Sequence, residues 1–535
     1  MPYAITGRCI QCDICLPVCP TGAIAILEGK EFWIDPTLCN NCDGHAPEPQ
    51  CVLACPVDSP IPFQAKKGRC KAGDRSITNP DLFPNGKTNL FASAITVWEL
   101  CNVLAQRRSL PWQTDADGKL YYQRPVNQGR SLVTFHVIDT LNTQSPVALG
   151  TAEALAAIDT FDVRAACLHL IYAAYAASLE QPWQQEFVIS DRQIEEYLGL
   201  DKRKDLTKPA KLALIKELAQ QPCKLAISMD WKPKGKVKGF SLETSQLWHL
   251  LEIQHHFQED ELGCKHITGL TFRVKAGAWA SYFLNRNGYK NHTAFYQYGT
   301  LPKSLLTTVM SIWQQHEGAA RIMLWLLFKT RMGQEQRVTV PTLMRVAYGE
   351  TRLAQAASQL EGRKRLLRTF ESDLEVLNHY HIKPVFDPIT YPTEIQPLWA
   401  KLSELPDDAE AALEFWTNDG HRASRLTDAA PRGKWNRLMN ARLLRFELPE
   451  NWQQPSSTNS KQKHPRKTNR QRLLPSYFTL SGQEIADARK KLKLSQRALA
   501  DRIGKSQSWV RDVERGRFQP TPKYQTILRR ILQLE

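Results

Sequence analysis

The chain has 535 residues, of which 42% are hydrophobic and 23% charged, and a formal net charge of +16. That length exceeds what one hydrophobic core supports and predicts three or four domains. The basic excess favours a polyanionic partner, usually nucleic acid. No stretch offers the ~18 uninterrupted apolar residues of a membrane helix, so we expect no membrane partner.

Eight cysteines near the amino terminus form two matched sets, and each set ends in Cys-Pro. The first set is Cys9, Cys12, Cys15 and Cys19, and the second set is Cys39, Cys42, Cys51 and Cys55. Thiolates are the soft ligands that iron–sulfur clusters select, and three closely spaced cysteines before a Cys-Pro are typical of cluster sites. Zinc and disulfides are the alternatives, but zinc sites use C-x2-C pairs without a third closely spaced cysteine. The pattern therefore predicts two [4Fe–4S] clusters as cofactors.

The two sets are halves of an internal repeat, in which a short strand, a cysteine loop, a helical turn and a second strand occur twice. This repeat resembles the bacterial 2[4Fe–4S] ferredoxins, and its longer gap between Cys42 and Cys51 is similar to that of a long-loop subclass. The resemblance implies that one cluster is held by Cys9, Cys12, Cys15 and Cys55. It implies that the other cluster is held by Cys39, Cys42, Cys51 and Cys19. The side chains expected to exclude water from the clusters are Ile5, Ile24, Ile26, Ile34 and Val52.

Residues 1–65 are accordingly predicted to form a small ferredoxin-like α+β domain, and 66–90 to form a linker rich in Pro, Lys, Gly and Asn. From 91 to 402 the pattern is mainly helical. Within it, segments at about 160–235 and 300–390 both run in the order short helix, glycine turn, longer helix, strand, which is the order of a winged-helix unit. This pattern is similar to the tandem winged helices of plasmid replication initiators. The alternative is a helical scaffold whose charges face water.

Two segments separate this region from the carboxyl terminus. Residues 403–450 read as helical without an assignable role. Residues 451–479 contain no Asp or Glu and cannot bury enough apolar surface to fold, which predicts a flexible basic linker that can neutralise phosphates. The expected fold class is therefore multidomain and mainly α, with a helical or winged-helix-like middle and an all-α end.

Residues 480–535 carry the run Ser-Gln-x-x-Leu-Ala-x-x-x-Gly, followed by Ser-Gln-Ser and Glu-x-Gly. We expect a first helix from about Gln483 and further helices at 496–502 and 507–515, the last two capped by Ser495 and Ser506. The run resembles the lambda-type (XRE) helix-turn-helix family, which implies that the third helix enters the major groove of DNA. The residues that the resemblance places against DNA are Gln496, Ser506, Gln507, Ser508, Arg511, Asp512 and Arg515. Gln can pair with adenine and Arg with guanine, and members of this family usually act as dimers.

No P-loop, dinucleotide-binding turn, H-E-x-x-H or G-x-S-x-G motif occurs. We therefore expect no catalytic residues and no enzyme. The amino terminus lacks a signal pattern, and the eight thiols need a reducing compartment, so we expect a cytoplasmic protein.

A cluster module at one end and a helix-turn-helix at the other resemble the cyanobacterial PatB/CnfR-type transcription regulators. That resemblance implies an activator of nitrogen-fixation genes under low oxygen, with double-stranded promoter DNA as its partner. A homodimer, RNA polymerase and a redox partner are further candidate partners. Two alternatives stay open: an electron-transfer protein or redox enzyme tethered to DNA, and a cluster-containing replication initiator.

Overall fold

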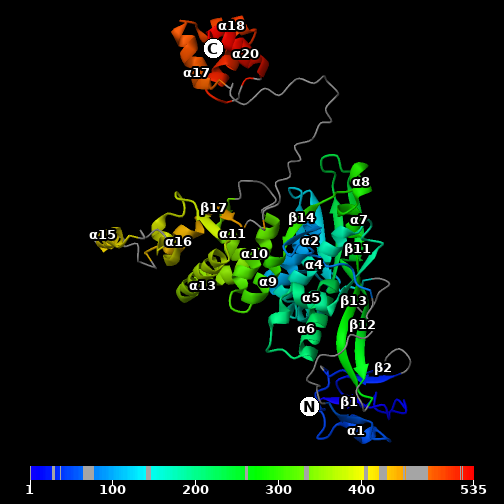
Figure 1. The fold of residues 1–535 in the computed structure, drawn as a ribbon. Coiled ribbons are helices and arrows are strands. Elements are labelled where there is room, and N and C mark those ends of the chain that lie inside the picture. Colours follow the sequence, from blue (N-terminus) through cyan, green and yellow to red (C-terminus); the bar gives the residue numbers. More distant parts are fainter. Residues whose placement is uncertain are drawn as a thin grey trace. The chain divides into compact units, whose positions relative to one another are not determined.

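The computed structural model describes residues 2–26, 31–36, 38–63, 77–139, 146–259, 263–329, 337–402, 408–420, 431–449, 452, 480–517, 520 and 522–534. It contains two compact units, Met1–Ser456 and Ser457–Glu535, and each is described by itself (Figure 1). The predicted linkers lie outside the described residues at 66–76 and, apart from Trp452, at 451–479. None of the described helices is long and apolar enough to cross a membrane.

The first unit begins with the cysteine module, which comprises the described residues between 2 and 63. Its elements are β1 (Tyr3–Ile5), β2 (Ile24–Ile26), β3 (Phe32–Ile34), α1 (Gln50–Ala54) and β4 (Pro60–Pro62). β1 pairs antiparallel with β4, and β2 pairs antiparallel with β3. Each two-stranded ribbon therefore joins one strand from each half of the sequence repeat. Ile5, Ile24, Phe32 and Ile34 form a small core between the ribbons and the cysteine loops.

The rest of the first unit, described between residues 77 and 452, is the body. Its α-helices are α2 (Ile95–Gln106), α3 (Thr151–Asp159), α4 (Val163–Ser178), α5 (Asp191–Tyr197), α6 (Lys208–Gln220), α7 (Trp279–Phe283), α8 (Arg286–Lys290), α9 (Lys303–Ile312), α10 (Glu317–Lys329), α11 (Val340–Tyr348), α12 (Glu350–Ser358), α13 (Leu360–His379), α14 (Leu398–Leu402), α15 (Ala409–Gly420) and α16 (Lys434–Met439). Its strands are β5 (Thr88–Ala92), β6 (Gln113–Thr114), β7 (Leu120–Val126), β8 (Ser131–Val137), β9 (Glu186–Ser190), β10 (Leu225–Trp231), β11 (Phe240–Gln246), β12 (Trp248–Glu259), β13 (Lys265–Ala276), β14 (Tyr298–Pro302), β15 (Val338–Thr339), β16 (Lys383–Phe386) and β17 (Arg442–Glu447). Four 3-10 turns connect them: η1 (Arg107–Ser109), η2 (Leu200–Lys202), η3 (Gln221–Lys224) and η4 (Thr393–Ile395).

Helix α4 lies at the centre of the body. It is apolar on every side, and its residues from Ala165 to Ala176 are all buried, as expected of a helix surrounded by other elements. Asp162 caps its first turn by accepting a hydrogen bond from the backbone N–H of Arg164 at 2.8 Å. Helix α2 and strand β5 pack on α4. A separate five-stranded sheet has the order β11-β10-β8-β7-β6.

Two further sheets have three strands each and similar strand orders. One has the order β12-β13-β9, and the other has the order β15-β17-β16. In both, a strand that directly precedes a short helix pairs with the last of the three strands in the chain. Strands β12 and β13 lie beyond the predicted bound at 235, and β17 lies beyond the bound at 390, whereas β16 lies within it. The tandem winged-helix assignment stays a prediction.

The body contains more strand than the mainly helical pattern predicted. The strand expected to end the first winged-helix unit falls on residues 225–227, which are instead the start of β10 in the five-stranded sheet. The described part of the predicted linker, 77–90, packs on the body: Phe83 is 2% exposed, and the backbone N–H of Leu82 donates to the Tyr197 hydroxyl at 2.9 Å. Contacts between distant segments, by sheet pairing in the first case and by side-chain packing in the second, decide both points, and local periodicity does not record them.

The second unit contains α17 (Gly482–Lys491), α18 (Gln496–Ile503), α19 (Gln507–Glu514) and α20 (Pro522–Leu532). The side chains of Ser495 and Ser506 cap α18 and α19 by accepting backbone N–H groups at 3.0 and 3.2 Å. Gly504 ends α18 with a φ of +71°, a left-handed conformation that glycine adopts without a steric penalty. A core that includes Ile485, Leu499 and Val510 holds the helices together.

Candidate iron–sulfur site and DNA-reading helix

Two small cavities, each partly open to solvent, lie in the cysteine module. The thiols that line the first cavity are Cys9, Cys12, Cys15 and Cys55, with Ile5, Phe32 and Pro60 among the apolar residues beside them. The thiols that line the second cavity are Cys19, Cys39, Cys42 and Cys51, beside Ile24 and Ile34. Four soft donors around an apolar hollow fit a [4Fe–4S] cluster, in which each thiolate binds a different iron.

Turns in the cysteine loops direct backbone N–H groups at the sulfur atoms. Gln11 and Asn41 adopt φ angles of +57° and +64°, which reverse the chain beside their cysteines. Hydrogen bonds to sulfur run from Gln11 N to Cys9 Sγ at 3.4 Å, Ala23 N to Cys19 Sγ at 3.3 Å, Gln50 N to Cys42 Sγ at 3.4 Å and Ser59 N to Cys55 Sγ at 3.3 Å. Donors aimed at sulfur favour the thiolate over the thiol, and the thiolate is the ligand form.

Burial and crowding act against ionisation of two other thiols, those of Cys51 and Cys15. Burial, together with the neighbouring sulfurs of Cys39 and Cys42, raises the pKa of Cys51 to about 11. Burial raises the pKa of Cys15 as well. Four thiolates around one cavity therefore require a positively charged partner between them, which is what iron supplies when bound. Within the described residues, no group of three or more His, Cys, Asp or Glu side chains could hold a single metal ion.

The core expected around the clusters is present in part. Ile5, Ile24 and Ile34 are 7%, 7% and 2% exposed. Ile26 is 51% exposed, contrary to expectation. Ile26 shares a face of β2 with the buried Ile24, but it is the last residue of the strand and lies beyond the small core.

Strand β3 connects the cavities with the body. Phe32 lines the first cavity and Ile34 lines the second. Because side chains alternate along a strand, Trp33 points to the opposite face, where its ring meets Phe257 at 5.1 Å and His255 at 5.8 Å between centroids. Both of these residues lie on β12, in the long hairpin that reaches the cysteine module (Figure 1).

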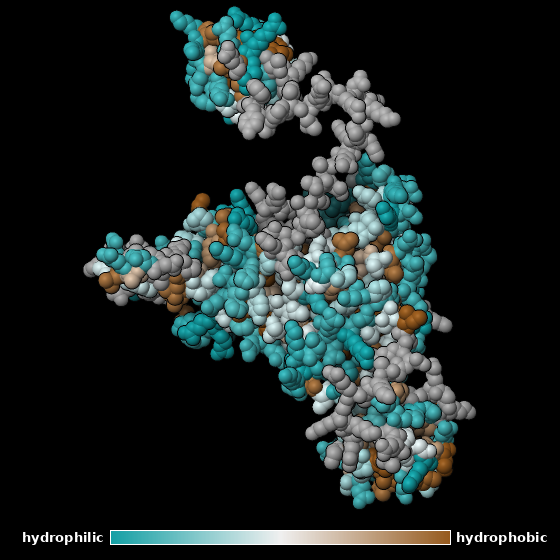
Figure 2. All heavy atoms as spheres, viewed as in Figure 1, coloured by the Kyte–Doolittle hydropathy of each residue, from teal (hydrophilic) through white to brown (hydrophobic). Residues whose placement is uncertain are grey.

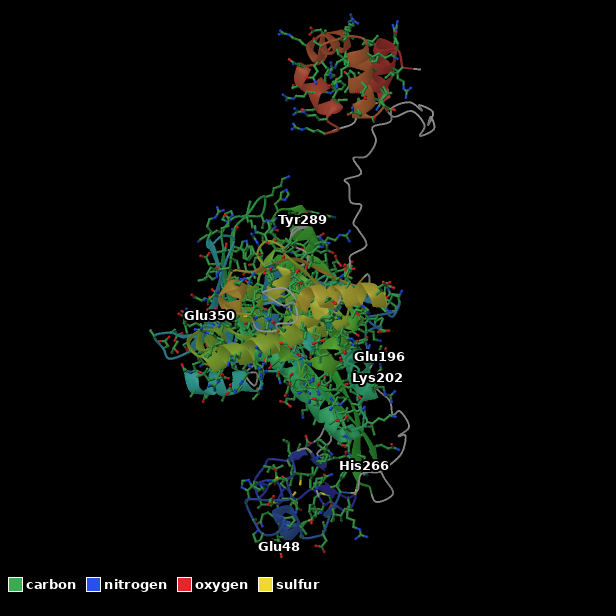
Figure 3. The ribbon with its side chains drawn as sticks, turned by 90° about the vertical axis from the view of Figure 1, so that its left-hand side faces the viewer. Glu48, Glu196, Lys202, His266, Tyr289 and Glu350 are labelled. Atoms are coloured by element: carbon green, nitrogen blue, oxygen red, sulfur yellow. The ribbon has the colours of Figure 1, made fainter. Side chains whose placement is uncertain are left out.

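Other contacts join the same two parts. The Phe63 and His266 rings are 5.2 Å apart, and Figure 3 labels His266 at this junction and Glu48 at the far end of the module. Lys265 forms an ion pair with Glu31, and Lys216 Nζ of α6 lies 3.9 Å from Asp35 Oδ2. A Cβ atom at Gly263 would lie 2.8 Å from the Gly7 backbone nitrogen. The hairpin β12–β13 and the end of α6 therefore form the surface on which the cysteine module sits.

Helix α19 presents most of the residues predicted to meet DNA. Ser506, Gln507, Ser508, Arg511 and Arg515 are exposed. The last four of these lie within about 100° of arc on a helix of 3.6 residues per turn. They form one polar face, opposite the buried Val510 and Val513.

Two predicted DNA-facing residues are engaged inside the unit. Asp512 is half-buried, and its Oδ1 accepts from Arg517 Nη1 at 3.2 Å. The Gln496 side-chain amide donates to Glu514 Oε2 at 2.7 Å, and Arg489 donates to the same carboxylate at 2.5 and 3.1 Å. Burial would raise the pKa of Glu514, but the bonds from Arg489 and Gln496 outweigh it and lower the pKa. This network ties the start of α18 to the end of α19.

Sequence reasoning missed two features of these sites. One is the contact of Trp33 with the hairpin, for which the sequence signal is an aromatic residue between two inward side chains of a strand. Gly482 starts α17 where a Cβ would clash with the carbonyl oxygens of Val513 and Glu514. Its φ is ordinary, so no turn signal marks it.

Comparison with known proteins gives matches at both ends of the chain. A 4Fe-4S binding domain family matches residues 2–25, and a helix-turn-helix family matches residues 485–532. A ferredoxin-like protein in the nif region of Nostoc sp. is 53% identical over 58 residues, which cover 11% of this chain and 50% of that protein. Ferredoxin-1 of Chlorobaculum tepidum is 44% identical over 59 residues, which cover 11% of this chain and 92% of that protein.

The matched part spans about half the length of the nif-region relatives from Trichormus and Nostoc. Among solved structures, domains 2–3 of RctB match with a TM-score of 0.27 and 11% identity, covering 54% of this chain and 92% of that one. The amino-terminal 4Fe–4S module and the carboxyl-terminal helix-turn-helix, a DNA-binding fold, are thereby established.

Proposed function

Because the cysteine module belongs to the ferredoxin-like iron–sulfur proteins, we propose that the whole chain is an iron–sulfur transcription regulator that binds promoter DNA and responds to oxygen or redox state. Two [4Fe–4S] clusters are its cofactors, held by the four-thiol sets around the two cavities. It acts as a regulator without catalytic activity. The observation that carries the proposal is one chain that combines two four-thiol cavities with a helix-turn-helix whose third helix, α19, has an exposed polar face.

The target genes follow from two converging resemblances. A cluster module followed by a helix-turn-helix resembles the PatB/CnfR-type regulators. Several relatives of the cysteine module are named as ferredoxin-like proteins in the nif region. We therefore propose that the chain activates nitrogen-fixation genes when oxygen is low.

The contact between the cysteine module and the body supports a route for the response. A bound [4Fe–4S] cluster is oxygen-labile and redox-active. Phe32 and Ile34 line the cavities and Trp33 contacts the hairpin, so a shift of β3 at the clusters would displace the ring that packs on the body. A coupling of the usual size, about 1–3 kcal/mol, would change DNA affinity about 5- to 150-fold.

The deciding experiment is a promoter-binding titration with the full chain, purified and assayed without oxygen and then repeated after exposure to air. Iron and sulfide are measured on the same samples. About eight irons per chain, tight and sequence-dependent binding, and a change in affinity after air exposure are expected. Material with far fewer irons when purified without oxygen, or equal affinity before and after air, refutes the proposal.

Electron transfer is the second candidate, and one observation favours it. Cys12 is exposed, and Ile10 and Ile14 beside it are 59% and 49% exposed, so the first cavity lies near a solvent-facing apolar rim. An electron carrier needs such access for its partner. Reversible reduction at low potential, with rapid reoxidation by a protein acceptor in the absence of DNA, would favour this function over regulation.

A further inference from the structure

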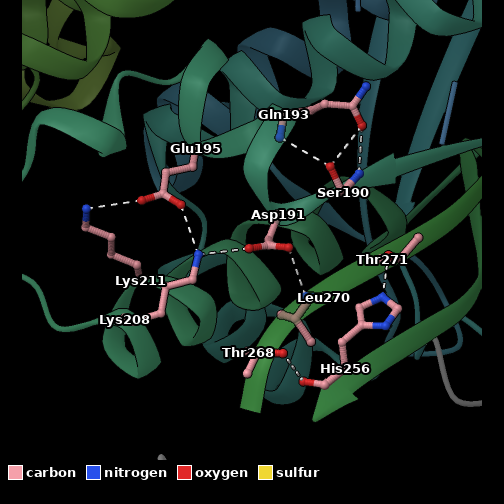
Figure 4. A network of polar contacts seen from close by, with 10 residues as sticks. All are labelled: Ser190, Asp191, Gln193, Glu195, Lys208, Lys211, His256, Thr268, Leu270 and Thr271. Atoms are coloured by element: carbon pink, nitrogen blue, oxygen red, sulfur yellow. Dashed lines mark hydrogen bonds and ion pairs between the residues drawn. The ribbon is translucent and has the colours of Figure 1, made fainter. Parts of the chain in front are cut away.

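Each of the two three-stranded sheets of the body packs against a longer helix, α6 in one case and α13 in the other. The two helices differ in whether their basic side chains form ion pairs within the body. On α6, Lys208 Nζ lies 2.9 Å from Asp191 Oδ2 and 3.0 Å from Glu195 Oε2, and Lys211 Nζ lies 3.2 Å from Glu195 Oε1 (Figure 4). Asp191 also accepts the Leu270 backbone N–H at 3.1 Å, which fixes the network to β13. These lysines are neutralised within the body.

The remaining basic residue near the end of α6 faces the cysteine module. Lys216 lies near Asp35, and the adjoining hairpin contacts Trp33 and Phe63. This helix and its hairpin are therefore occupied by intramolecular partners. They leave little positive charge for a polyanion.

Helix α13 has the opposite character. Lys364, Arg365 and Arg368 are exposed and lie within about 100° of arc in its first half. Lys364 pairs with Glu361 at 3.0 Å, whereas no acidic group among the described residues lies within 4.0 Å of the charged nitrogens of Arg365 or Arg368. The apolar Leu360 at the start of the helix is 64% exposed. Figure 2 shows a mostly hydrophilic surface where Figure 1 places α13.

Exposed basic side chains on a helix are often only solvated, but three features of α13 favour binding of a polyanion. The guanidinium groups of Arg365 and Arg368, which have no ion-pair partner among the described residues, lie about one turn apart in the first half of a helix 20 residues long. An α-helix fits the major groove, and arginines beside it reach the bordering phosphates. The opposite face of α13 is anchored in the core through Leu366, Phe370 and Leu374.

We propose that α13 is a second DNA-binding element, which holds duplex DNA through phosphate contacts from Arg365 and Arg368. It is separate from the helix-turn-helix, and it rests on the proposed DNA-binding function of the chain. Phosphate contacts position a protein without reading sequence. Helix α19 therefore supplies specificity, and α13 supplies affinity that depends on salt.

The test compares full-length variants for binding to a promoter fragment and to a scrambled duplex over a range of salt concentrations. In Arg365→Gln/Arg368→Gln, the slope of log K against log salt is expected to fall by about 2, since each phosphate contact contributes about 0.9. Affinity is expected to fall equally for both duplexes, so that the preference for the promoter is kept. Glutamine is a good helix former, and unchanged circular dichroism verifies that α13 is intact.

A matched control removes the same charge elsewhere. Lys234 and Lys236 are exposed on the turn between β10 and β11, and Lys234→Gln/Lys236→Gln is expected to keep the original slope. A slope unchanged in the α13 variant, or an equal fall in the control, overturns the inference. A third variant, Gln507→Ala/Arg511→Ala, should lose the preference for the promoter. If it keeps that preference, the proposed reading by α19 fails whatever the α13 variant does.

Discussion

The ring of Trp33 meets the ring of Phe257 edge to face, with centroids 5.1 Å apart and an interplanar angle of 67°. Trp33 belongs to the strand that lines both cavities, and Phe257 belongs to the hairpin of the body. Trp33 is only 6% exposed, although it points away from the cysteines. This contact couples the metal-binding end of the chain to the body.

The first prediction concerns that contact. Trp33→Ala and Phe257→Ala should each reduce the change in DNA affinity between anaerobic and air-exposed protein. The double variant should be no worse than the stronger single variant, because an aromatic pair contributes a coupling of about 0.5–1.5 kcal/mol. Binding titrations in both states measure the effect. Tyr289→Ala removes an aromatic ring that is 54% exposed and should leave the response intact, while strictly additive effects of the two substitutions would contradict the coupling.

The second prediction concerns the exposed thiol of the first cavity. In Cys12→Ser, a hydroxyl replaces a soft iron ligand, so the iron content should fall from about eight towards four per chain. The oxygen-dependent change in DNA affinity should disappear. The second unit folds around its own core, and its isolated DNA binding should be unaffected.

Iron analysis and anaerobic binding titrations check this prediction, with Cys223→Ala as the control. Cys223 is 1% exposed in the body and lines neither cavity, so its loss should not alter the iron content. A complete oxygen response from Cys12→Ser would refute the sensor function.

The third prediction tests the close approach of two helices in the helix-turn-helix. Gly482→Ala should destabilise the second unit by about 1–3 kcal/mol, as overpacking does in a core. The added methyl group would clash with the carbonyl oxygens of Val513 and Glu514. Gly504→Asn is the comparison: nothing lies within 4 Å of a Cβ there, and Asn tolerates a positive φ. Thermal unfolding followed by circular dichroism should rank Gly482→Ala well below Gly504→Asn, and equal melting temperatures would contradict the clash.

The fourth prediction is a pH dependence of the body. His169 is fully buried, with Nδ1 accepting from Trp248 Nε1 at 2.9 Å and Nε2 donating to the Val97 carbonyl at 2.9 Å. Burial lowers the pKa of His169 from 6.5 to about 4. The unfolded chain therefore binds a proton that the folded chain rejects. The contribution is fully present above pH 6.5 and is lost as pH falls towards 4, by about 3 kcal/mol in total.

Urea unfolding of the wild type and His169→Gln at pH 7.5, 6 and 5 measures this contribution. The variant should be less stable at pH 7.5, and the difference in the free energy of unfolding should shrink as the pH is lowered. A difference that stays constant across these pH values would show that His169 does not titrate as the structure implies.

The sequence predicted those features whose information is local. Cysteine spacing within a few residues is enough to indicate an iron–sulfur module, and Ser495, Gly504 and Ser506 mark the boundaries of α18 and α19 by capping and turn chemistry. The structure has these helices at Gln496–Ile503 and Gln507–Glu514, within one residue of the predicted ends. The family matches confirm an amino-terminal 4Fe–4S domain and a carboxyl-terminal helix-turn-helix.

Tertiary structure decided what depends on segments far apart in the chain. Residues 225–227 look like the closing strand of a winged-helix unit, yet they pair with β8 almost ninety residues earlier. Ile26 is an apolar residue of the kind found in cores, yet its side chain is exposed. Trp33, in contrast, is buried because Phe257 of a distant hairpin packs against it. Sequence periodicity reports which face of an element is apolar. Which element covers that face is decided by packing between segments far apart in the chain. The contact of the cysteine module with the β12–β13 hairpin is therefore visible only in the tertiary structure.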